Sequence, residues 1–522
     1  MSTVSAKRTL LRGGMIADGI GTAIQRADLL IEGDKIAWIG ERDSGASEEN
    51  AEVIDLDPGS VVCPGFIDAH VHAEGPLLEH GVVEGALAQG VTTLVVGQDG
   101  ESWIGANADT ARYLNRYFGP VNGRLEPARD LSVAGYRDAV AGRLVQNVAV
   151  LASQGTIRHN VAGMAAGPLN DEQRAAARRE VEAALAEGAV GLSSGLDYYP
   201  SRFGQADEIA YLAAPLAAAG RPYVSHLRGY GPWVRAGLEE IIGVGRIAGI
   251  RVHASHLWGA PEDIETAFQA ADSADVPVTF DMYPYRKSST ILAMLLLPSE
   301  LQAGGPDQTI AALKDPDQRA KLLTYDNFTD GALADLYLGC LPDAFRHLGG
   351  MSIAEATSDS PKSAGEWVLD LLIDTELSVG AHLDRPALAD EHLTWLANHD
   401  RHSTGSDGIY QGQHPHPRGW GTFARLAEQY TADNADTGYQ HLARHCAANP
   451  ADAFGLTTRG RLAADMTADI CIIGPNGLAG HAIYGAPTIP ATGQDLIFVN
   501  GVTVRTDGRP NPAVLPGRLA AI

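Results

Sequence analysis

The amino-acid sequence predicts an α/β protein whose alternating strands and helices close into a barrel, with a smaller β domain beside it. Between residues 61 and 283, short β-rich runs alternate with longer segments of helical periodicity, as in repeated βα units around a parallel sheet. One more strand-like run follows at 402–407, and both chain ends are rich in hairpin signals. Together these observations predict a (β/α)8 TIM-type barrel with a small composite β-sandwich domain built from both chain termini.

The predicted barrel strands are short runs rich in β-branched and aromatic residues, and eight of them are enough to close a barrel. The clearest helix between them is DEQRAAARREVEAALAEG, where Asn170 is the expected N-cap, Gln173 completes a capping box and Gly188 ends the helix. The strands are expected at 61–72, 91–97, 147–152, 189–194, 222–226, 251–256, 277–283 and 402–407.

Two parts of the chain fall outside the repeated units. Residues 284–401 are too many for a simple crossover and contain a helical pattern of their own, EWVLDLLIDTEL, so we expect an insertion such as a lid. The chain ends carry short strands and the turn pair Asn500-Gly501, and neither end is large enough to bury much surface alone. We therefore expect residues 1–60 and 456–522 to form one β domain beside a barrel at 61–455.

Composition limits the range of partners. The 522 residues are 45% hydrophobic and 20% charged, and 39 basic against 64 acidic residues give a net charge of −25. Such a surface repels nucleic acid and anionic lipid, so we expect neither as a partner. No apolar run approaches the ~18 residues of a membrane helix, and the first residues lack a secretory signal, which predicts a cytoplasmic protein. The widely spaced cysteines are expected to be free thiols: Cys63, Cys340, Cys446 and Cys471.

Histidines at strand ends are the strongest chemical signal. His70 and His72 stand two apart at the end of an apolar strand, so both imidazoles leave the same face and can reach one metal ion. Single residues of ligand type close three later strands: His226, His256 and Asp407. Because the C-terminal strand ends of a βα barrel form one rim, these five side chains are expected to converge on a metal site.

Less specific interpretations apply to each residue taken alone. Any one of these histidines is as readily a hydrogen-bonded strand cap as a ligand, and the metal site rests on all five residues together. Asp99, in Gly-Gln-Asp-Gly at the end of the second strand, is either a further ligand or the centre of an Asx turn. Asp68 either orients a ligand or caps the backbone.

The motifs VVCPGFIDAHVH, SHLR, ASHL and GSDG resemble those of the amidohydrolase superfamily. Further segments narrow the resemblance to the D-aminoacylase group, the N-acyl-D-amino-acid deacylases, and the similarity covers nearly the whole chain. The segments are EGAVGLSSGLDYYP, SHLRGY, DMYPYRKSSTILAMLLLP, GSDGIYQGQHPHPRGWGTFARL and NPADAFGLTTRGRLAADMTADICIIGPN.

The resemblance implies a zinc-dependent hydrolase with one or two Zn²⁺ ions. His70, His72 and Asp407 would form one metal position, and His226 with His256 the other. Metal-activated water would cleave the amide bond of an N-acyl-D-amino acid or a close analogue, with Asp407 as proton shuttle. The expected partner is this small-molecule substrate, and association into a homo-oligomer is left open.

Two positions depart from the group. Asp99 stands where the group usually has a cysteine, and no lysine lies between Lys35 and Lys287 to serve as a carboxylated bridging ligand, so the number of metals stays open. Trp258 stands where the group typically has a substrate-binding lysine, and this favours a substrate with an apolar or aromatic portion.

Further residues match or suit the substrate pocket of the group. Tyr283, Ser289 and Arg418 match the residues that bind the substrate carboxylate, and Arg228 lies two residues beyond a ligand histidine, where its guanidinium would suit a carboxylate. Tyr198 is expected in the pocket wall or as support for an oxyanion.

Two other functions remain compatible with the sequence. A hydrolase with the same metal site would act on another amide, a cyclic amide, a dipeptide or an ester, because one fold hosts many chemistries. A metal-binding homologue without turnover is the second alternative. Retention of Asp407 argues against it, because an inactive site has no need of a proton shuttle.

Overall fold

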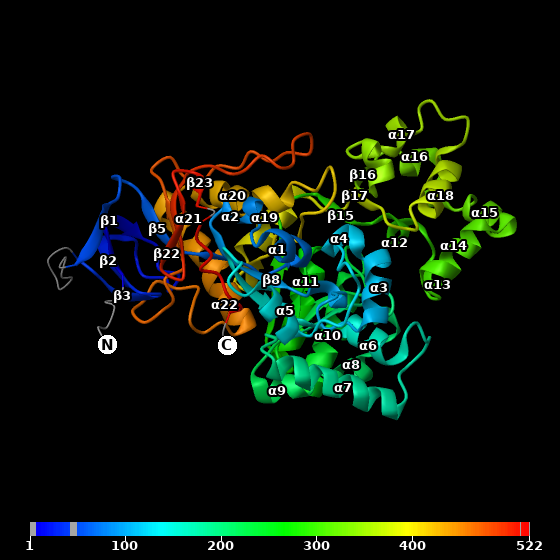
Figure 1. The fold of residues 1–522 in the computed structure, drawn as a ribbon, viewed down its shortest axis with the longest axis horizontal. Helices are drawn as coiled ribbons and strands as arrows, with labels where there is room; N and C mark the ends of the chain where they lie inside the picture. The colour runs from blue at the N-terminus through cyan, green and yellow to red at the C-terminus, as the bar shows by residue number, and fades with distance from the viewer. Residues whose placement is uncertain (1–6, 42–49, 512, 521–522) are drawn as a thin grey trace.

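The structure is a computed structural model that describes residues 7–41, 50–511 and 513–520. A β domain lies at one end of the long axis, the barrel occupies the middle, and the insertion forms a lobe at the other end (Figure 1). In the described residues no helix is both long enough and apolar enough to cross a bilayer.

The barrel predicted from the sequence is confirmed. Two parallel sheets, β6-β8-β9 and β10-β11-β12-β13-β14-β18, follow one another with only Leu151 between β9 and β10. The barrel closes where the Ala69 N–H, just after β6, donates to the Thr404 carbonyl of β18 (3.0 Å). The strands are β6 (Phe66–Asp68), β8 (Val91–Val96), β9 (Asn147–Val150), β10 (Ala152–Ser153), β11 (Leu192–Gly195), β12 (Tyr223–His226), β13 (Val252–Ala254), β14 (Val278–Met282) and β18 (His402–Thr404).

Helices cover the barrel, and several contact one another in chain order around it. The helix expected after Asn170 forms with its full capping box and ends at Ala186, and Gly188 adopts a φ of 108° just beyond it. The covering helices include α6 (Gln154–Ala162), α7 (Asp171–Ala186), α8 (Ala206–Ala213), α10 (Val234–Ala248), α11 (Pro261–Ser273), α19 (Asp390–Asn398) and α20 (Arg418–Thr431).

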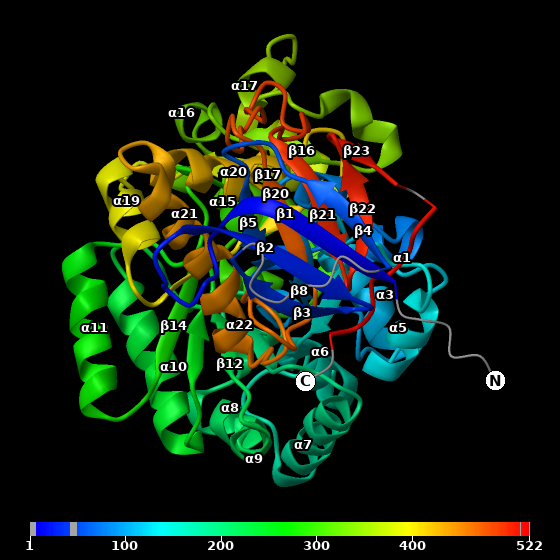
Figure 2. The same ribbon diagram turned by 90° about the vertical axis from the view of Figure 1, so that its left-hand side faces the viewer.

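Strands from both chain ends form one continuous nine-stranded sheet in the order β23-β22-β21-β20-β5-β1-β2-β3, with β4 also paired to β1 (Figure 2). The sheet curls back on itself, because Lys35 of β3 bridges to Thr467 just before β20. The strands are β1 (Arg8–Ile16), β2 (Gln25–Glu32), β3 (Lys35–Gly40), β4 (Ala51–Asp55), β5 (Val61–Pro64), β20 (Ile470–Ile473), β21 (Gln494–Val499), β22 (Val502–Thr506) and β23 (Arg509–Pro510).

Local details of the β domain agree with the sequence, with one difference. Asn500 and Gly501 form the β21–β22 turn with positive φ values of 48° and 76°. All four cysteines are free. The predicted strand 61–72 is split into β5, β6 and β7 (Val71–His72), and β5 belongs to the β domain because it pairs with β1 and β20. The exact domain boundaries stay predictions.

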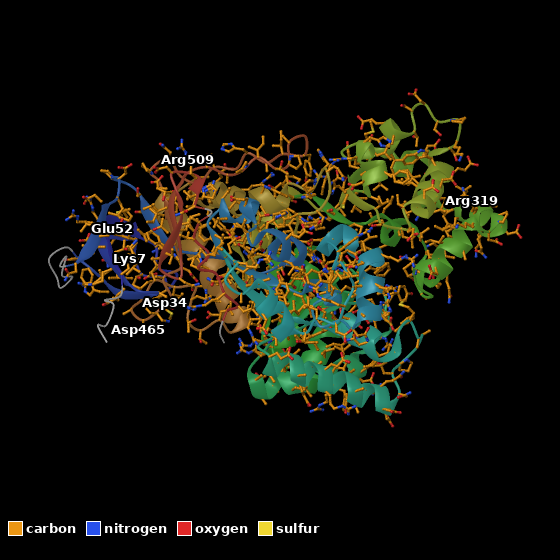
Figure 3. The ribbon with its side chains drawn as sticks, in the orientation of Figure 1. Lys7, Asp34, Glu52, Arg319, Asp465 and Arg509 are labelled. Atoms are coloured by element: carbon orange, nitrogen blue, oxygen red, sulfur yellow. The ribbon has the colours of Figure 1, made fainter. Side chains whose placement is uncertain are left out.

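The insertion adds a three-stranded antiparallel sheet and a group of helices. The sheet has the order β15-β17-β16, with β15 (Lys287–Ile291), β17 (Gly380–Asp384) and β16 (Tyr337–Cys340). The labelled Arg319 lies at the outer side of this lobe (Figure 3) and pairs with Asp370 (2.8 Å). The helices are α12 (Leu292–Leu296), α13 (Ser299–Gln302), α14 (Pro306–Lys314), α15 (Pro316–Leu322), α16 (Asp330–Leu333), α17 (Ile353–Ala356) and α18 (Ala364–Asp374).

A buried polar cluster joins the β domain to the barrel. Asp469, just before β20, forms a buried ion pair with Arg459 and accepts from Asn147 of β9 (3.1 Å) and from the Asn500 N–H (2.8 Å). Asn500 in turn donates to Asn147 (2.8 Å). One carboxylate therefore bonds to both parts of the fold.

We expect Asp469→Ala to lower the free energy of unfolding by about 3–5 kcal/mol, because it leaves the Arg459 charge buried without a partner. Chemical denaturation followed by tryptophan fluorescence measures the loss. Asp433→Ala, at an exposed position, is the control and should stay within about 0.5 kcal/mol of wild type. Equal stabilities of the two variants would contradict this role of Asp469.

Candidate active site

The predicted ligand residues meet at the C-terminal rim of the barrel. Three of them, Asp99, His256 and Asp407, have positive φ values of 57°, 34° and 49°. Non-glycine residues adopt this conformation rarely, and it is concentrated at functional sites. The backbone thus turns sharply where three barrel strands end, and the rim is built from residues held in an uncommon conformation.

Asp407 joins the two histidines of the first strand. Its Oδ1 lies 3.4 Å from His72 Nε2 and 3.8 Å from His70 Nε2. One ligand atom from each of these three residues lies within 4.8 Å of the others, and all three side chains are buried. This group coincides with one of the two predicted metal positions.

Asp99 lies at the centre of the four histidines. Its carboxylate oxygens are 3.5 Å from both His70 Nε2 and His72 Nε2, 3.6 Å from His256 Nε2 and 3.8 Å from His226 Nδ1. His226 Nδ1 is 3.1 Å from His256 Nε2. Asp99 Oδ1 is buried and has no hydrogen-bond partner among the described residues, so the carboxylate faces the imidazoles and not a backbone turn.

The outer nitrogens of the first two histidines are held by neighbouring side chains. The His72 Nδ1–H donates to Asn122 Oδ1 (2.7 Å), because an amide oxygen only accepts, and Nε2 is therefore the atom that faces the two aspartates. His70 Nδ1 lies 3.4 Å from Asp281 Oδ2. Both rings therefore present Nε2 to the centre of the site.

Asp281 is a supporting residue that the sequence analysis missed. Its carboxylate also lies 3.1 Å from His253 Nε2 and accepts from the His256 N–H (2.9 Å). Burial would raise the pKa of Asp281, but His70 and His253 outweigh it and hold the pKa below its usual range. The available signal was its place at the end of the predicted strand 277–283. His253 lies outside the ligand groups.

Asp68 caps the backbone instead of contacting an imidazole. Its oxygens accept from the Ser406 N–H (2.8 Å) and the Ser406 hydroxyl (2.5 Å), and more weakly from the His70 N–H (3.3 Å). Burial raises the pKa of Asp68 to about 7. Asp68 therefore fixes the segment that leads into Asp407.

The electrostatics of the site favour ionised carboxylates. Burial raises the pKa of Asp99, but the surrounding imidazoles outweigh it and bring the pKa well below its usual range. Burial likewise lowers the pKa of His72, yet hydrogen bonding to Asp407 and Asp99 raises it to about 10. Both effects show strong attraction between the anionic oxygens and positive charge at the imidazoles.

The donor set suits a divalent transition metal. It consists of imidazole nitrogens and carboxylate oxygens, the ligands that zinc takes in catalytic sites. His70 Nε2 and Asp99 Oδ1 are buried without a hydrogen-bond partner in the described part of the chain. Buried polar atoms normally have partners, and a cation at the centre would satisfy them.

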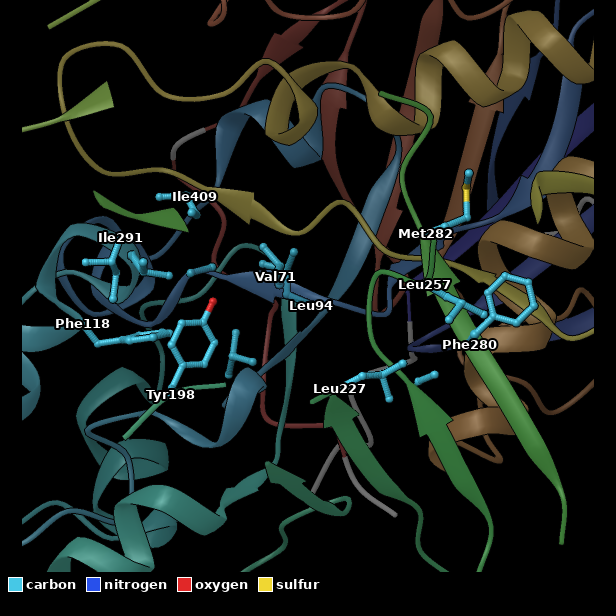
Figure 4. Packing of buried hydrophobic residues seen from close by; sticks show 14 of the residues in the cluster. Val71, Leu94, Phe118, Tyr198, Leu227, Leu257, Phe280, Met282, Ile291 and Ile409 are labelled. Carbon is cyan, nitrogen blue, oxygen red and sulfur yellow. The ribbon is translucent and has the colours of Figure 1, made fainter. Parts of the chain in front are cut away.

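A cavity of about 170 Å³ opens beside this centre. Of the predicted substrate residues, Tyr198, Trp258, Tyr283 and Ser289 line it. Tyr198 packs edge-to-face against Phe118 with ring centroids 5.1 Å apart (Figure 4), and its hydroxyl lies 3.1 Å from Thr290 Oγ1. The cavity therefore has an aromatic wall and a hydroxyl-bearing wall next to the ligand residues.

The two predicted carboxylate-binding arginines are engaged elsewhere. Arg418 is fully buried, pairs with Asp407 Oδ2 (2.8 Å) and donates to the Tyr283 hydroxyl (2.9 Å). Arg228 pairs with Glu240 (3.1 Å), and its other nitrogens donate to backbone carbonyls. Neither lines the cavity, so the structure corrects the expectation that Arg228 is free to bind a substrate.

Comparison with known proteins gives the family. The chain is 30% identical to an N-acyl-D-glutamate deacylase of Alcaligenes xylosoxydans xylosoxydans over 98% of this chain and 96% of the relative. It is also 30% identical to a D-aminoacylase of that organism, over 95% and 94% of the two chains. The chain belongs to the D-aminoacylase family of amidohydrolases. No model in a collection of protein families matches it.

Solved structures of the D-aminoacylase family agree with the fold. A D-aminoacylase superposes with a TM-score of 0.81 at 26% identity, covering 98% of this chain and 99% of the other. An N-acyl-D-glutamate deacylase from Bordetella bronchiseptica, complexed with zinc and a phosphonate mimic of the tetrahedral intermediate, gives 0.80 at 26% identity over 99% and 100%. The barrel with its β-rich domain is thus the architecture of the D-aminoacylase family.

Asp99→Asn distinguishes two roles of Asp99, a metal ligand or a residue that only forms the turn. Asparagine tolerates the same positive φ but carries no charge. We expect the variant to keep its thermal stability and lose metal affinity, since it lacks an anion that faces four histidines. Metal analysis after dialysis against graded chelator measures the affinity, with Asp335→Asn on the exposed surface of the insertion as control. Unchanged metal content would leave Asp99 only a turn residue.

Proposed function

We propose that this protein hydrolyses the amide bond of an N-acyl-D-amino acid. The observation that carries the proposal is the position of Asp407, which lines the cavity. One of its oxygens faces the histidine cluster and the other faces Arg418. The relatives named above, an N-acyl-D-glutamate deacylase and a D-aminoacylase, are the support for the D configuration. The cytoplasmic location and homo-oligomer stay predictions.

The proposed zinc ligands fall into two groups. His70, His72 and Asp407, which lie close enough together to share an ion, would hold one. His226 with His256 would hold the other position beside Asp99, although the second close group in the structure is His70, Asp99 and His256. Bound zinc polarises a carbonyl oxygen and lowers the pKa of water toward about 7. Asn122 and Asp281 would keep the histidine rings turned toward the ion.

Asp407 is proposed to move the proton. Burial would raise the pKa of Asp407, but Arg418 and the nearby histidines outweigh it and lower the pKa, so the carboxylate is ionised when substrate arrives. It would take the proton of the attacking water and then give it to the leaving amine nitrogen. Because Arg418 disfavours the protonated form of Asp407, Asp407 readily gives its proton to the leaving nitrogen.

The cavity would hold the acyl amino acid against Asp407. Burial raises the pKa of Tyr198 well above its usual value, so its hydroxyl keeps its proton and can donate to the developing negative charge on the carbonyl oxygen. Met294, Leu295 and Leu383 form an apolar part of the wall, which suits an acyl chain or an apolar side chain.

The proposal predicts that the protein releases amine from only one enantiomer of its substrates. Purified protein containing bound zinc should release amine from N-acetyl-D-amino acids and not from their L-enantiomers. Elemental analysis and an amine-release assay on matched D and L pairs measure both properties in one preparation. Zinc-loaded protein that cleaves only cyclic amides or dipeptides would replace this function with another hydrolytic one.

Asp407→Asn should reduce kcat by about 10²–10⁴-fold, because the amide cannot shuttle the proton. The variant should still fold, at reduced stability, since asparagine keeps the size and can still accept from Arg418 but no longer neutralises its buried charge. Zinc content must be measured in the same samples, because Asp407 is also a proposed ligand. Near-normal turnover by the zinc-loaded variant would remove Asp407 from the mechanism.

A further inference from the structure

One arginine lines the cavity beside the candidate metal centre. Arg385 directly follows β17 of the insertion and is only 6% exposed. No other lysine or arginine is among the described residues that line this cavity. The charge thus comes from the insertion and not from the barrel.

Arg385 differs from the other buried arginines of the described chain. Each of the other four lies within 4.0 Å of a carboxylate, whereas no carboxylate of the described residues pairs with Arg385. A buried guanidinium without a counterion is unfavourable, because its desolvation is not compensated. The four pairs are Arg158–Glu208, Arg418–Asp407, Arg459–Asp469 and Arg505–Glu84.

Backbone acceptors and two aromatic rings fix the guanidinium of Arg385. Its Nε–H donates to the Arg286 carbonyl (2.9 Å) and Nη2 to the Tyr285 carbonyl, while Nη1 has no acceptor among the described residues. The guanidinium carbon lies 5.0 Å from the ring centroid of Tyr283 and 5.4 Å from that of Trp258. These cation–π contacts hold the charge in place without neutralising it.

Arg385 is also close to the proposed proton shuttle. The Tyr283 ring that contacts Arg385 carries the hydroxyl bonded to Arg418, and Arg418 pairs with Asp407. An anion bound by Arg385 therefore lies next to the residues that would act on the amide. Arg418 is already committed to Asp407, which leaves Arg385 as the cation available to a ligand.

We propose that Arg385 binds the α-carboxylate of the substrate and determines the preference for a free carboxylate. This inference rests on the proposed function, because the α-carboxylate of an N-acyl amino acid is attached to the same carbon as the scissile amide. Nη1 supplies the free donor for the carboxylate. Trp258, against the same guanidinium, then helps to orient the cation, in addition to offering an apolar surface to the substrate.

The test compares a charged and a neutral substrate of the same shape. For wild type and Arg385→Met, kcat/KM is measured on N-acetyl-D-leucine and on N-acetyl-D-leucinamide. We expect the ratio of the two values to fall by about 100-fold in the variant, mainly through a higher KM for the carboxylate. Arg346→Met is the matched control, because Arg346 is an exposed arginine of the insertion that does not line the cavity, and its ratio should stay at the wild-type value.

Two further measurements keep the result interpretable. Arg385→Lys, which keeps the charge but not the planar fork, should fall between wild type and Arg385→Met. Guanidine added to Arg385→Ala should restore part of the activity on the carboxylate substrate, which a purely structural role of Arg385 would not allow. A folded Arg385→Met variant with the wild-type ratio would overturn the proposal.

Failure of the proposed function can be distinguished from failure of the Arg385 proposal. If wild type releases no amine from either substrate, the hydrolase proposal fails. Calorimetric binding of N-acetyl-D-leucine to wild type and Arg385→Met then decides the role of Arg385. Weaker binding to the variant would support the anion site, and equal binding would exclude it.

Discussion

The structure depends on the fact that the parallel strands of a closed barrel, eight when β9 and β10 are taken as one, end at one rim. Residues separated by more than three hundred positions are thereby brought within a few ångströms, as His70 and Asp407 are. The rest of the molecule supports this arrangement. The β domain is tied to the barrel through Asp469, and the covering helices bury the outer faces of the strands. Sharp turns with positive φ at three strand ends then set the directions of Asp99, His256 and Asp407.

Charge compensation explains how so many polar groups stay buried at the rim. Asp99 and Asp407 face imidazoles, Arg418 neutralises one oxygen of Asp407, and Asp281 spans two histidines and a backbone N–H. Each group stabilises the charged form of the next, as the lowered pKa values of the aspartates show. A bound cation would complete this network of charges.

The sequence predicted the barrel, the composite β domain and the convergence of the rim residues, because strand periodicity and strand-end positions are local properties. It did not identify Asn122, Asp281 or Arg385. Asn122 and Arg385 lie outside the barrel strands, and Asp281, although it ends one, shows no spacing motif with the histidines it contacts. The sequence also indicated Arg228 as a carboxylate-binding residue, and here the structure differs. The position of Arg228 beside His226 is suitable, but Glu240 and nearby carbonyls occupy its guanidinium, and only the packing of the chain reveals this.

The insertion supplies both β15, which carries Ser289, and the segment after β17, which carries Arg385. The ligand residues all belong to the barrel rim. Evolution can therefore alter one lobe of this protein and change which molecules it accepts while leaving its bond-breaking apparatus untouched. Substrate preference and catalytic chemistry are therefore encoded in separate segments of the same gene.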